Sequence, residues 1–326
     1  MTWWSTGVRW DAGTGRPVLG WRGDTGAGRE RELRYGEVLG FRAVGARRCA
    51  GVWRGGRWVD CAEAAVLGAR TTRAQCPQCA RLDRVRSVAA DTYVDDPRPY
   101  RVYLAWFGDG LVKVGITRVE RGSARLLEQG AVAFAWLGSG PLMAARRTEE
   151  LLRAALGVPD RIPYDRKRAV RAELPAVEVR AGVLREVHRV AVGLPGWPES
   201  LQRAAECVVV DHGGVFGLAG LPPATAVVTE LRDGVVVRGT LLAAAGPDLH
   251  LLVNSNSNSN SNSNSNSNSN KPSTSTGAVV VVDGRLMAGW ELVRDDRDNG
   301  HGGEGGEGGV VSVPVRDVSA VQGGLF

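Results

Sequence analysis

The sequence predicts an α+β protein with three consecutive parts. Four of the five cysteines fall between residues 49 and 79, the stretch from 98 to 204 alternates strand and helix patterns, and the stretch from 205 to 326 is rich in short valine runs. We therefore expect a β-rich module at residues 1–97, a small mixed α/β core at 98–204 and a mostly β C-terminal region at 205–326.

The first part carries short apolar segments broken by glycine. Residues 16–21 and 37–44 have the composition of strands. Six of the ten tryptophans lie here, namely Trp3, Trp4, Trp10, Trp21, Trp53 and Trp58. Tryptophan can stack on nucleic-acid bases, although small β domains more often use it to fill their cores. The acidic and proline-containing residues 91–99 predict a boundary.

The cysteines of the first part predict a metal site. Cys76 and Cys79 flank Pro77 and Gln78 in a CxxC turn, and two further thiols precede them at Cys49 and Cys61. Four thiolates complete the tetrahedral site that structural Zn²⁺ prefers. Because Cys49 and Cys61 do not form a second CxxC pair, unpaired core thiols and a redox pair remain alternatives. Cys207, before a valine run, is expected to be a buried core thiol.

The central part reads as a hairpin followed by alternating helices and strands. We expect strands at 100–107, 111–117 and 133–138, a turn at 108–110, and helices at 121–131 and 141–156. Pro141 suits the first position of the last helix. The spacing of apolar residues places Glu149 on the buried face of this helix, whereas Glu150 lies on the wetter face with Arg146 and Arg153. A carboxylate that points inward requires a partner or a function.

The C-terminal part is predicted to be mostly β. Strand patterns occur at 226–231, 235–242 and 278–293. Between them, residues 254–277 form an Asn/Ser repeat with a Ser/Thr-rich end, which cannot bury apolar surface and is expected to be disordered. The glycine-rich acidic stretch at 295–309 is expected to be a loop.

Charge is distributed unevenly along the chain. Residues 1–204 carry 34 basic and 22 acidic side chains, whereas residues 205–326 carry 7 and 13. This asymmetry fits a polyanionic partner on one side of the molecule, with ordinary solvated surfaces as the alternative. No stretch is apolar enough to span a membrane, and residues 1–13 lack the charged and apolar pattern of a secretory signal, so a cytoplasmic protein without a membrane partner is expected.

The order of motifs in the central part resembles the GIY-YIG endonuclease core. Arg101-Val102-Tyr103 corresponds to the first motif, and Lys113-Val114-Gly115, ending twelve positions later, corresponds to the second. Arg125 and Glu149 match the helical arginine and the metal-binding glutamate of that core. The upstream cysteines, the VKVGITR run and the EQGA sequence at 128–131 also resemble a bacterial family called domain of unknown function 2797.

The GIY-YIG resemblance implies a catalytic set of Tyr103, Lys113, Arg125 and Glu149. In those nucleases the tyrosine positions or deprotonates water, the glutamate holds Mg²⁺ or Mn²⁺, and the arginine neutralises the phosphoryl group. The flanking Gly115, Thr117, Arg118 and Arg121 are expected to contact nucleic acid. Lys113 departs from the pattern because it replaces the second tyrosine. It would lower the pKa of Tyr103, contact phosphate, or mark a site that binds nucleic acid without cutting it.

Each of these residues also has an ordinary structural interpretation. Tyr103 suits a strand interior, Arg125 a helix surface, and Glu149 an ion pair with Arg146 or Arg153. Three hypotheses follow: a metal-dependent nuclease, a zinc-containing protein that binds nucleic acid without cleaving it, and a noncatalytic protein-interaction scaffold. Nucleic-acid binding ranks above the scaffold, and cleavage stays an open alternative to binding alone.

Overall fold

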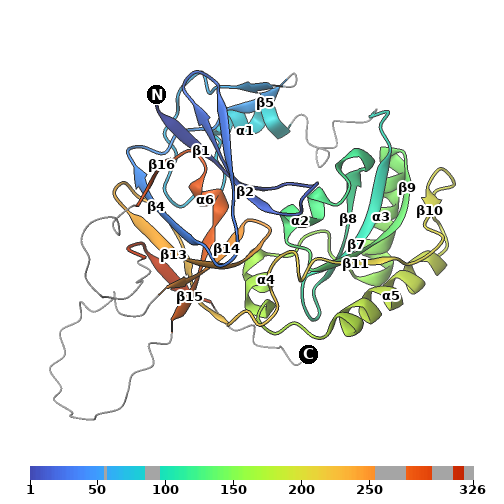
Figure 1. Cartoon of the computed structure of the whole chain (residues 1–326). Coiled ribbons are helices and arrows are strands. Elements are labelled where there is room, and N and C mark those ends of the chain that lie inside the picture. The colour runs from blue at the N-terminus through green and yellow to red at the C-terminus, as the bar shows by residue number, and fades with distance from the viewer. Residues whose placement is uncertain (55–56, 85–95, 254–276, 296–310, 319–326) are drawn as a thin grey trace, which may run out of the picture.

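A computed structural model describes residues 1–54, 57–84, 96–253, 277–295 and 311–318 (Figure 1). The predicted α+β class is confirmed, with strands more abundant than helices. The Asn/Ser repeat and nearly all of the glycine-rich stretch at 295–309 lie outside the described residues. No helix within the described residues combines the length and apolarity that a membrane span requires.

The larger sheet joins both ends of the chain. Its ten strands run in the order β17, β12, β15, β14, β13, β4, β16, β1, β2, β3. Their bounds are β1 Trp3–Trp10, β2 Pro17–Gly23, β3 Gly28–Glu32, β4 Val38–Val44, β12 Ala224–Val228, β13 Val236–Ala245, β14 Asp248–Val253, β15 Ala278–Asp283, β16 Glu291–Arg294 and β17 Val315–Asp317. Because β4 pairs with β13 and β16, the first and third parts share one sheet across the boundaries expected from sequence.

The smaller sheet is formed by the central part. Its order is β10, β9, β7, β8, and β11 also pairs with β9. The bounds are β7 Tyr100–Trp106, β8 Val112–Arg118, β9 Ala133–Gly140, β10 Gln202–Arg203 and β11 Val209–Asp211. The helices of this part are a 3₁₀ turn at Val119–Arg121, α2 Ala124–Gln129, α3 Leu142–Leu156, α4 Tyr164–Val170 and α5 Val177–Gly193. Helices α3 and α5 pack on β7.

Strand β7 is buried on both faces. Val102, Leu104 and Trp106 join the main core, and the alternate side chains of Tyr103 and Ala105 join a second cluster with Leu126 and Phe134. A strand covered on both sides is expected to be apolar throughout. This arrangement fixes Tyr103 rigidly on the face that also receives α2.

The two sheets meet where two glycine backbones touch. Gly130 ends α2 with a φ of 70°, in the left-handed region that favours glycine, and Gly246 in the β13–β14 turn has a φ of 62°. A Cβ on Gly246 would lie 2.9 Å from the backbone nitrogen of Gly130. The glycine of the EQGA sequence, Gly130, is therefore required by the contact between the sheets.

A buried ion cluster reinforces this junction from α4. The fully buried carboxylate of Asp248 accepts hydrogen bonds from Arg168 at 2.6 and 3.1 Å and from Arg171 at 2.5 Å. Arg168 also donates to Asp283 at 2.9 Å. Since Arg168 and Arg171 lie at α4 and Asp248 begins β14, the cluster links the central part to the larger sheet.

Several elements differ from the sequence-based expectation. The 278–293 segment is not one strand, because α6 at Gly284–Met287 interrupts it and the Asp283 side chain accepts a hydrogen bond from the backbone N–H of Arg285. The expected helix at 121–131 is shorter, because Gly122 and Gly130 bound it. Helices α4 and α5 were not predicted. Cys207 is half-buried and not a core residue.

Candidate functional site

A cavity of about 980 Å³ lies between the smaller and larger sheets. Strand β8, α2 and α3 form one wall, and residues of β1, the β13–β14 turn, α4 and α6 form the other. The cavity lining includes all eight central residues that the sequence singled out, namely Tyr103, Lys113, Gly115, Thr117, Arg118, Arg121, Arg125 and Glu149. Residues from a stretch of 47 positions, 103–149, thus converge on one site.

The cavity lining is strongly basic. Its eight basic residues are Lys113, Arg118, Arg121, Arg125, Arg146, Arg161, Lys167 and Arg285, and its three acidic residues are Glu128, Glu149 and Asp160. The formal charge of the lining is therefore +5. A concave surface of one sign concentrates counter-ions and lowers the free energy of a bound anion.

Tyr103 is held in place by its neighbours. Its side chain is 1% exposed, and its hydroxyl accepts a hydrogen bond of 2.9 Å from Nε2 of Gln129. Gly115 is its direct cross-strand partner, and a Cβ there would lie 2.4 Å from the Tyr103 hydroxyl. Glycine in the second motif is thus explained by the space that the tyrosine ring occupies.

Lys113 lies beside Tyr103 without lowering its pKa. The Nζ atom is 5.8 Å from the centre of the Tyr103 ring and donates to the backbone carbonyl of Asp160 at 2.9 Å. Burial raises the pKa of Tyr103, which is opposite to the effect expected from a neighbouring lysine. Burial, aided by the Arg125 charge, lowers the pKa of Lys113 to about 8. The lysine therefore supplies a charge that titrates near neutral pH.

Glu149 lies half-buried on α3, as its helical spacing predicted. Burial raises its pKa, while the charge of Lys113 acts in the opposite direction. The adjacent Glu150 instead lies in solvent and accepts two hydrogen bonds from Arg153, at 2.7 and 2.9 Å. The two neighbouring glutamates thus have different environments, and only Glu149 lines the cavity.

The arginines of the cavity differ in how firmly they are committed to protein partners. Arg121 and Arg125 are 41% and 46% exposed and both form ion pairs with Glu128. Arg118 instead donates to the Tyr100 hydroxyl at 3.1 Å and pairs with the buried Asp96. We conclude that Arg121 and Arg125 can reorient toward a ligand at small cost, whereas Arg118 has a structural role as well. Thr117 is buried at the cavity wall.

Helices α4 and α6 contribute residues that sequence reasoning missed. Lys167 is 4% exposed, donates to the Gln129 carbonyl at 2.9 Å and lies 3.8 Å from the centre of the Phe107 ring. Burial and the nearby Arg171 lower the pKa of Lys167 to about 7. Arg285 stacks 4.3 Å from the centre of the Tyr164 ring. The chain has three lysines, and both that lie in its described part line this cavity; this scarcity was the signal available in the sequence.

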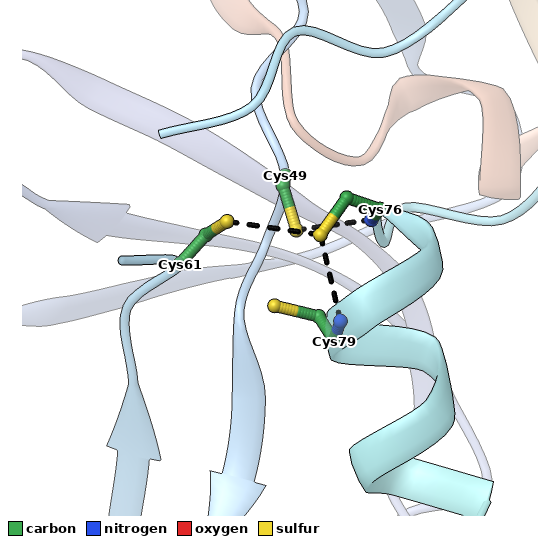
Figure 2. A group of neighbouring side chains, drawn as sticks. All are labelled: Cys49, Cys61, Cys76 and Cys79. Atoms are coloured by element: carbon green, nitrogen blue, oxygen red, sulfur yellow. Dashed lines mark hydrogen bonds between the residues drawn. The ribbon is translucent and has the colours of Figure 1, made fainter. Parts of the chain in front are cut away.

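The four clustered cysteines converge on a second site (Figure 2). All four Sγ atoms lie within 4.8 Å of one another, and no disulfide joins them. Cys76 and Cys79 come from the start of α1, Pro77–Arg84, while Cys61 follows the hairpin of β5, Val52–Arg54, and β6, Arg57–Val59. Figure 2 shows the four side chains pointing toward a common centre.

The geometry of the cysteine cluster suits a tetrahedral metal ion. The Sγ atoms of Cys61 and Cys76 are 3.8 Å apart, close to the separation that zinc–sulfur bonds of about 2.3 Å impose. Backbone N–H groups of Cys76 and Cys79 point at the sulfurs of Cys49 and Cys76, at 3.2 and 3.4 Å. Such contacts orient thiolates in metal sites. The four predicted ligands are therefore brought together.

Comparison with known proteins identifies a family without assigning an activity. No curated protein and no solved structure matches the chain. A family described as "Protein of unknown function (DUF2797)" matches residues 36–260. This range includes the cysteine cluster and the whole central part, and it exceeds half of the chain. The protein therefore belongs to the DUF2797 family.

Proposed function

We propose that the protein binds nucleic acid, with a backbone phosphate held in the cavity between the two sheets. The observation that carries this proposal is the convergence of eight basic and three acidic side chains on one cavity, with Lys113 buried among them. Arginine forks match phosphate oxygens with paired hydrogen bonds, and lysine adds a compact charge. Residues 1–204, which supply most of the lining, also hold the chain's excess of positive charge.

Arg121 and Arg125 are the cavity residues best suited to bind a phosphodiester group of the nucleic-acid backbone. Both are partly exposed and are paired only with Glu128 among the contacts described above. A phosphate would compete for their guanidinium groups at little cost, because exposed ion pairs contribute about 0–1 kcal/mol. Lys113 would approach the same phosphate from the floor of the cavity.

The test is fluorescence anisotropy with labelled single-stranded and double-stranded DNA and RNA. We expect Arg125→Ala to weaken binding about tenfold, since a hydrogen bond to a charged group contributes about 1.5 kcal/mol or more. Arg189→Ala is the matched control, because Arg189 also forms an exposed ion pair with a glutamate three residues away, but outside the cavity. Absence of binding to all four nucleic acids would contradict the proposal and favour the protein-interaction scaffold.

A second candidate function is hydrolysis of the bound phosphodiester. It is favoured by Glu149, a half-buried carboxylate in the same cavity as Tyr103 and Lys113. Mg²⁺ is commonly held by one or two carboxylates together with substrate phosphates, so Glu149 is the residue that would hold Mg²⁺ or Mn²⁺. Such an ion would supply Lewis-acid activation. The Tyr103 hydroxyl, which accepts from Gln129, has its own proton available to orient a ligand oxygen.

Hydrolysis is tested separately from binding. With Mg²⁺ or Mn²⁺ present, cleavage of labelled oligonucleotides is expected in the wild type and is expected to be lost in Glu149→Ala. Glu150→Ala is the matched control, because Glu150 lies next in sequence and pairs with Arg153 in solvent. Binding without cleavage under every metal condition would leave a noncatalytic nucleic-acid-binding protein.

The cysteine cluster is proposed to hold a structural Zn²⁺ as part of the same protein. Four thiolates with no open position form a closed site, which is typical of structural zinc. The ion would join α1 to the loops around Cys49 and Cys61. These loops need such a link, because an isolated two-stranded hairpin like β5–β6 is only marginally stable. Buried Arg47 supports this region, since its guanidinium donates to the carbonyls of Ala288 and Arg285 at 2.8 and 3.0 Å.

A further inference from the structure

The hairpin next to the cysteine cluster exposes two tryptophans. Trp53 and Trp58 are 53% and 42% exposed, and their rings meet edge to face with centroids 5.7 Å apart. Elsewhere in the described chain, Trp10, Trp106 and Trp290 are buried. Two large rings in solvent lose the stabilisation that burial would give them. Their placement therefore suggests a ligand-binding surface and not a core.

A groove of about 240 Å³ opens between this hairpin, the start of β1 and the end of β2. Trp4 and Trp58 line it, together with Arg22 and Arg48. The Arg22 guanidinium lies 5.4 Å from the centre of the Trp58 ring, and that of Arg48 lies 4.9 Å from the centre of the Trp4 ring. Trp4 and Arg22 are direct cross-strand partners, so their side chains lie on the same face of the sheet.

The charge around this groove favours an anionic partner with flat apolar groups. The groove lining carries two basic residues, Arg22 and Arg48, and two acidic residues, Asp24 and Asp60, and the adjacent hairpin adds Arg54 and Arg57. Unpaired bases stack on aromatic rings and on guanidinium planes, while arginines follow the phosphate backbone. A volume of this size accommodates individual rings, whereas a base-paired helix hides its ring faces in its own stack.

We propose that this tryptophan groove, lined by Trp4, Trp58, Arg22 and Arg48 and flanked by Trp53, stacks unpaired bases of single-stranded nucleic acid. The proposal rests on the proposed function, because the groove and the cavity would bind the same nucleic-acid chain. The groove and the cavity lie at opposite ends of β1, since Trp4 lines the former and Trp10 the latter. Six residues of a β-strand span about 20 Å. One molecule of single-stranded nucleic acid can therefore reach both sites.

The test measures binding of a fluorescein-labelled dT12 oligonucleotide and of a matched duplex. We expect Trp53→Ala/Trp58→Ala to weaken dT12 binding roughly tenfold or more, since each stacked base contributes about 1–3 kcal/mol. Binding of the duplex is expected to change by less than twofold. Trp53→Phe/Trp58→Phe is expected to retain most of the affinity, because phenylalanine keeps a stacking face. Val179→Ala, which removes an exposed apolar side chain from α5, is the control.

The cavity variant Lys113→Met/Arg125→Ala separates this proposal from the proposed function. Loss of dT12 binding in the cavity variant alone would overturn the tryptophan groove and leave the cavity function standing. Loss in the tryptophan variant alone would support the groove and contradict the cavity. Equal loss of dT12 and duplex binding in the tryptophan variant would also overturn single-strand stacking. A measurement on the wild type needs no substitution: dT12 is expected to quench its tryptophan fluorescence. Unchanged fluorescence at saturating dT12 would contradict stacking.

Discussion

At the scale of single residues, Gly115 determines where the Tyr103 hydroxyl lies. The two residues are cross-strand partners, and the ring occupies the space that any side chain at position 115 would need. The Tyr103 hydroxyl is held by Gln129, so the ring cannot move without breaking that hydrogen bond. One glycine thus shapes both the strand pair and the cavity.

Gly115→Ala is therefore expected to destabilise the protein by about 1–3 kcal/mol, as overpacking does in a buried site. Gly182→Ala is the matched control, because a Cβ there meets nothing within 4 Å and Gly182 lies inside α5. That change is expected to stabilise the protein slightly, by up to about 1 kcal/mol. Urea denaturation measures the change in the free energy of unfolding for both variants. Equal changes would contradict the claim that the Tyr103 ring leaves no room for a side chain at position 115.

Lys113 is expected to make nucleic-acid binding depend on pH. Its folded-state pKa is lowered to about 8, so it loses its proton as pH rises through that value, and attraction to phosphate is lost with it. Arg125, Arg161, Glu149 and Asp160 face it and also set this value. Affinity should therefore fall between pH 7 and 9.5.

The variant Lys113→Met tests the origin of this pH dependence. It is expected to bind more weakly at pH 7 and to show a flatter profile above pH 8. A remaining change near pH 7 is assigned to Lys167, whose pKa is lowered to about 7. Anisotropy titrations from pH 6 to 10 measure both curves, and parallel curves for variant and wild type would exclude Lys113 as the titrating group.

Much of the candidate site was predictable at this scale, and the remainder had a physical reason to be hidden. The GIY-YIG resemblance selected eight central residues, and all eight line the cavity. The direction of the Tyr103 pKa shift was not predictable, because burial outweighs neighbouring charge and burial depends on the whole fold. Lys167 was missed because helix α4 was not predicted, and Arg285 was missed because only the contact between the sheets brings α6 to the cavity.

At the scale of elements, local patterns predicted the central part well. The strands β7, β8 and β9 and the helix α3 lie within a few residues of their expected bounds, because turns at glycine and proline delimit them. Helix α5 was missed although Ala181, Leu184, His188 and Ala191 recur at helical spacing on its buried face. Its valines and Gly182 have low helix propensity, and tertiary packing outweighs this.

The cysteine cluster gives a prediction about one small element. Cys76→Ser is expected to abolish stoichiometric zinc and to lower the melting temperature, because the energy of metal binding contributes directly to folding of such a site. Cys207→Ser is the control, since Cys207 lies outside the cluster. Atomic absorption and calorimetry measure metal content and melting. Full zinc content and unchanged melting in Cys76→Ser would contradict the four-thiolate site.

At the scale of the whole molecule, the arrangement depends on contacts between distant segments. The larger sheet joins β1–β4 to β12–β17, and the buried Asp248 cluster fixes α4 against it. Local sequence patterns carry little information about which distant strands pair. For this reason the sequence suggested three consecutive modules, whereas the described structure has two large sheets with a cavity between them and a separate two-stranded sheet formed by β5 and β6.

Asp248→Asn is expected to destabilise the protein by about 3–5 kcal/mol, because it leaves buried arginine charges without a carboxylate. Burial alone would raise the pKa of Asp248, but the charges of Arg171 and Arg168 together outweigh it and lower the pKa to about 2, below its value in the unfolded chain. Its stabilising contribution is thus complete above about pH 4 and is lost as pH falls through about 2.

Urea denaturation from pH 2 to 7 measures this contribution of Asp248. The wild type is expected to lose stability more steeply at acid pH than Asp248→Asn does. Glu186→Gln, in an exposed ion pair with Arg189, is the control and is expected to cost less than about 1 kcal/mol. A small effect of Asp248→Asn, comparable to that of the control, would show that the ion cluster does not hold the two sheets together.

The most direct test of the central claim is the salt dependence of single-stranded nucleic-acid binding at pH 7. For single strands, the logarithm of affinity falls with the logarithm of salt concentration by about 0.7 per phosphate contact. Lys113→Met/Arg125→Ala should bind more weakly than the wild type with a slope smaller by about 1.4, the value for two lost contacts, while Arg189→Ala should match the wild type. Equal affinities and slopes for all three proteins would contradict a phosphate-binding cavity.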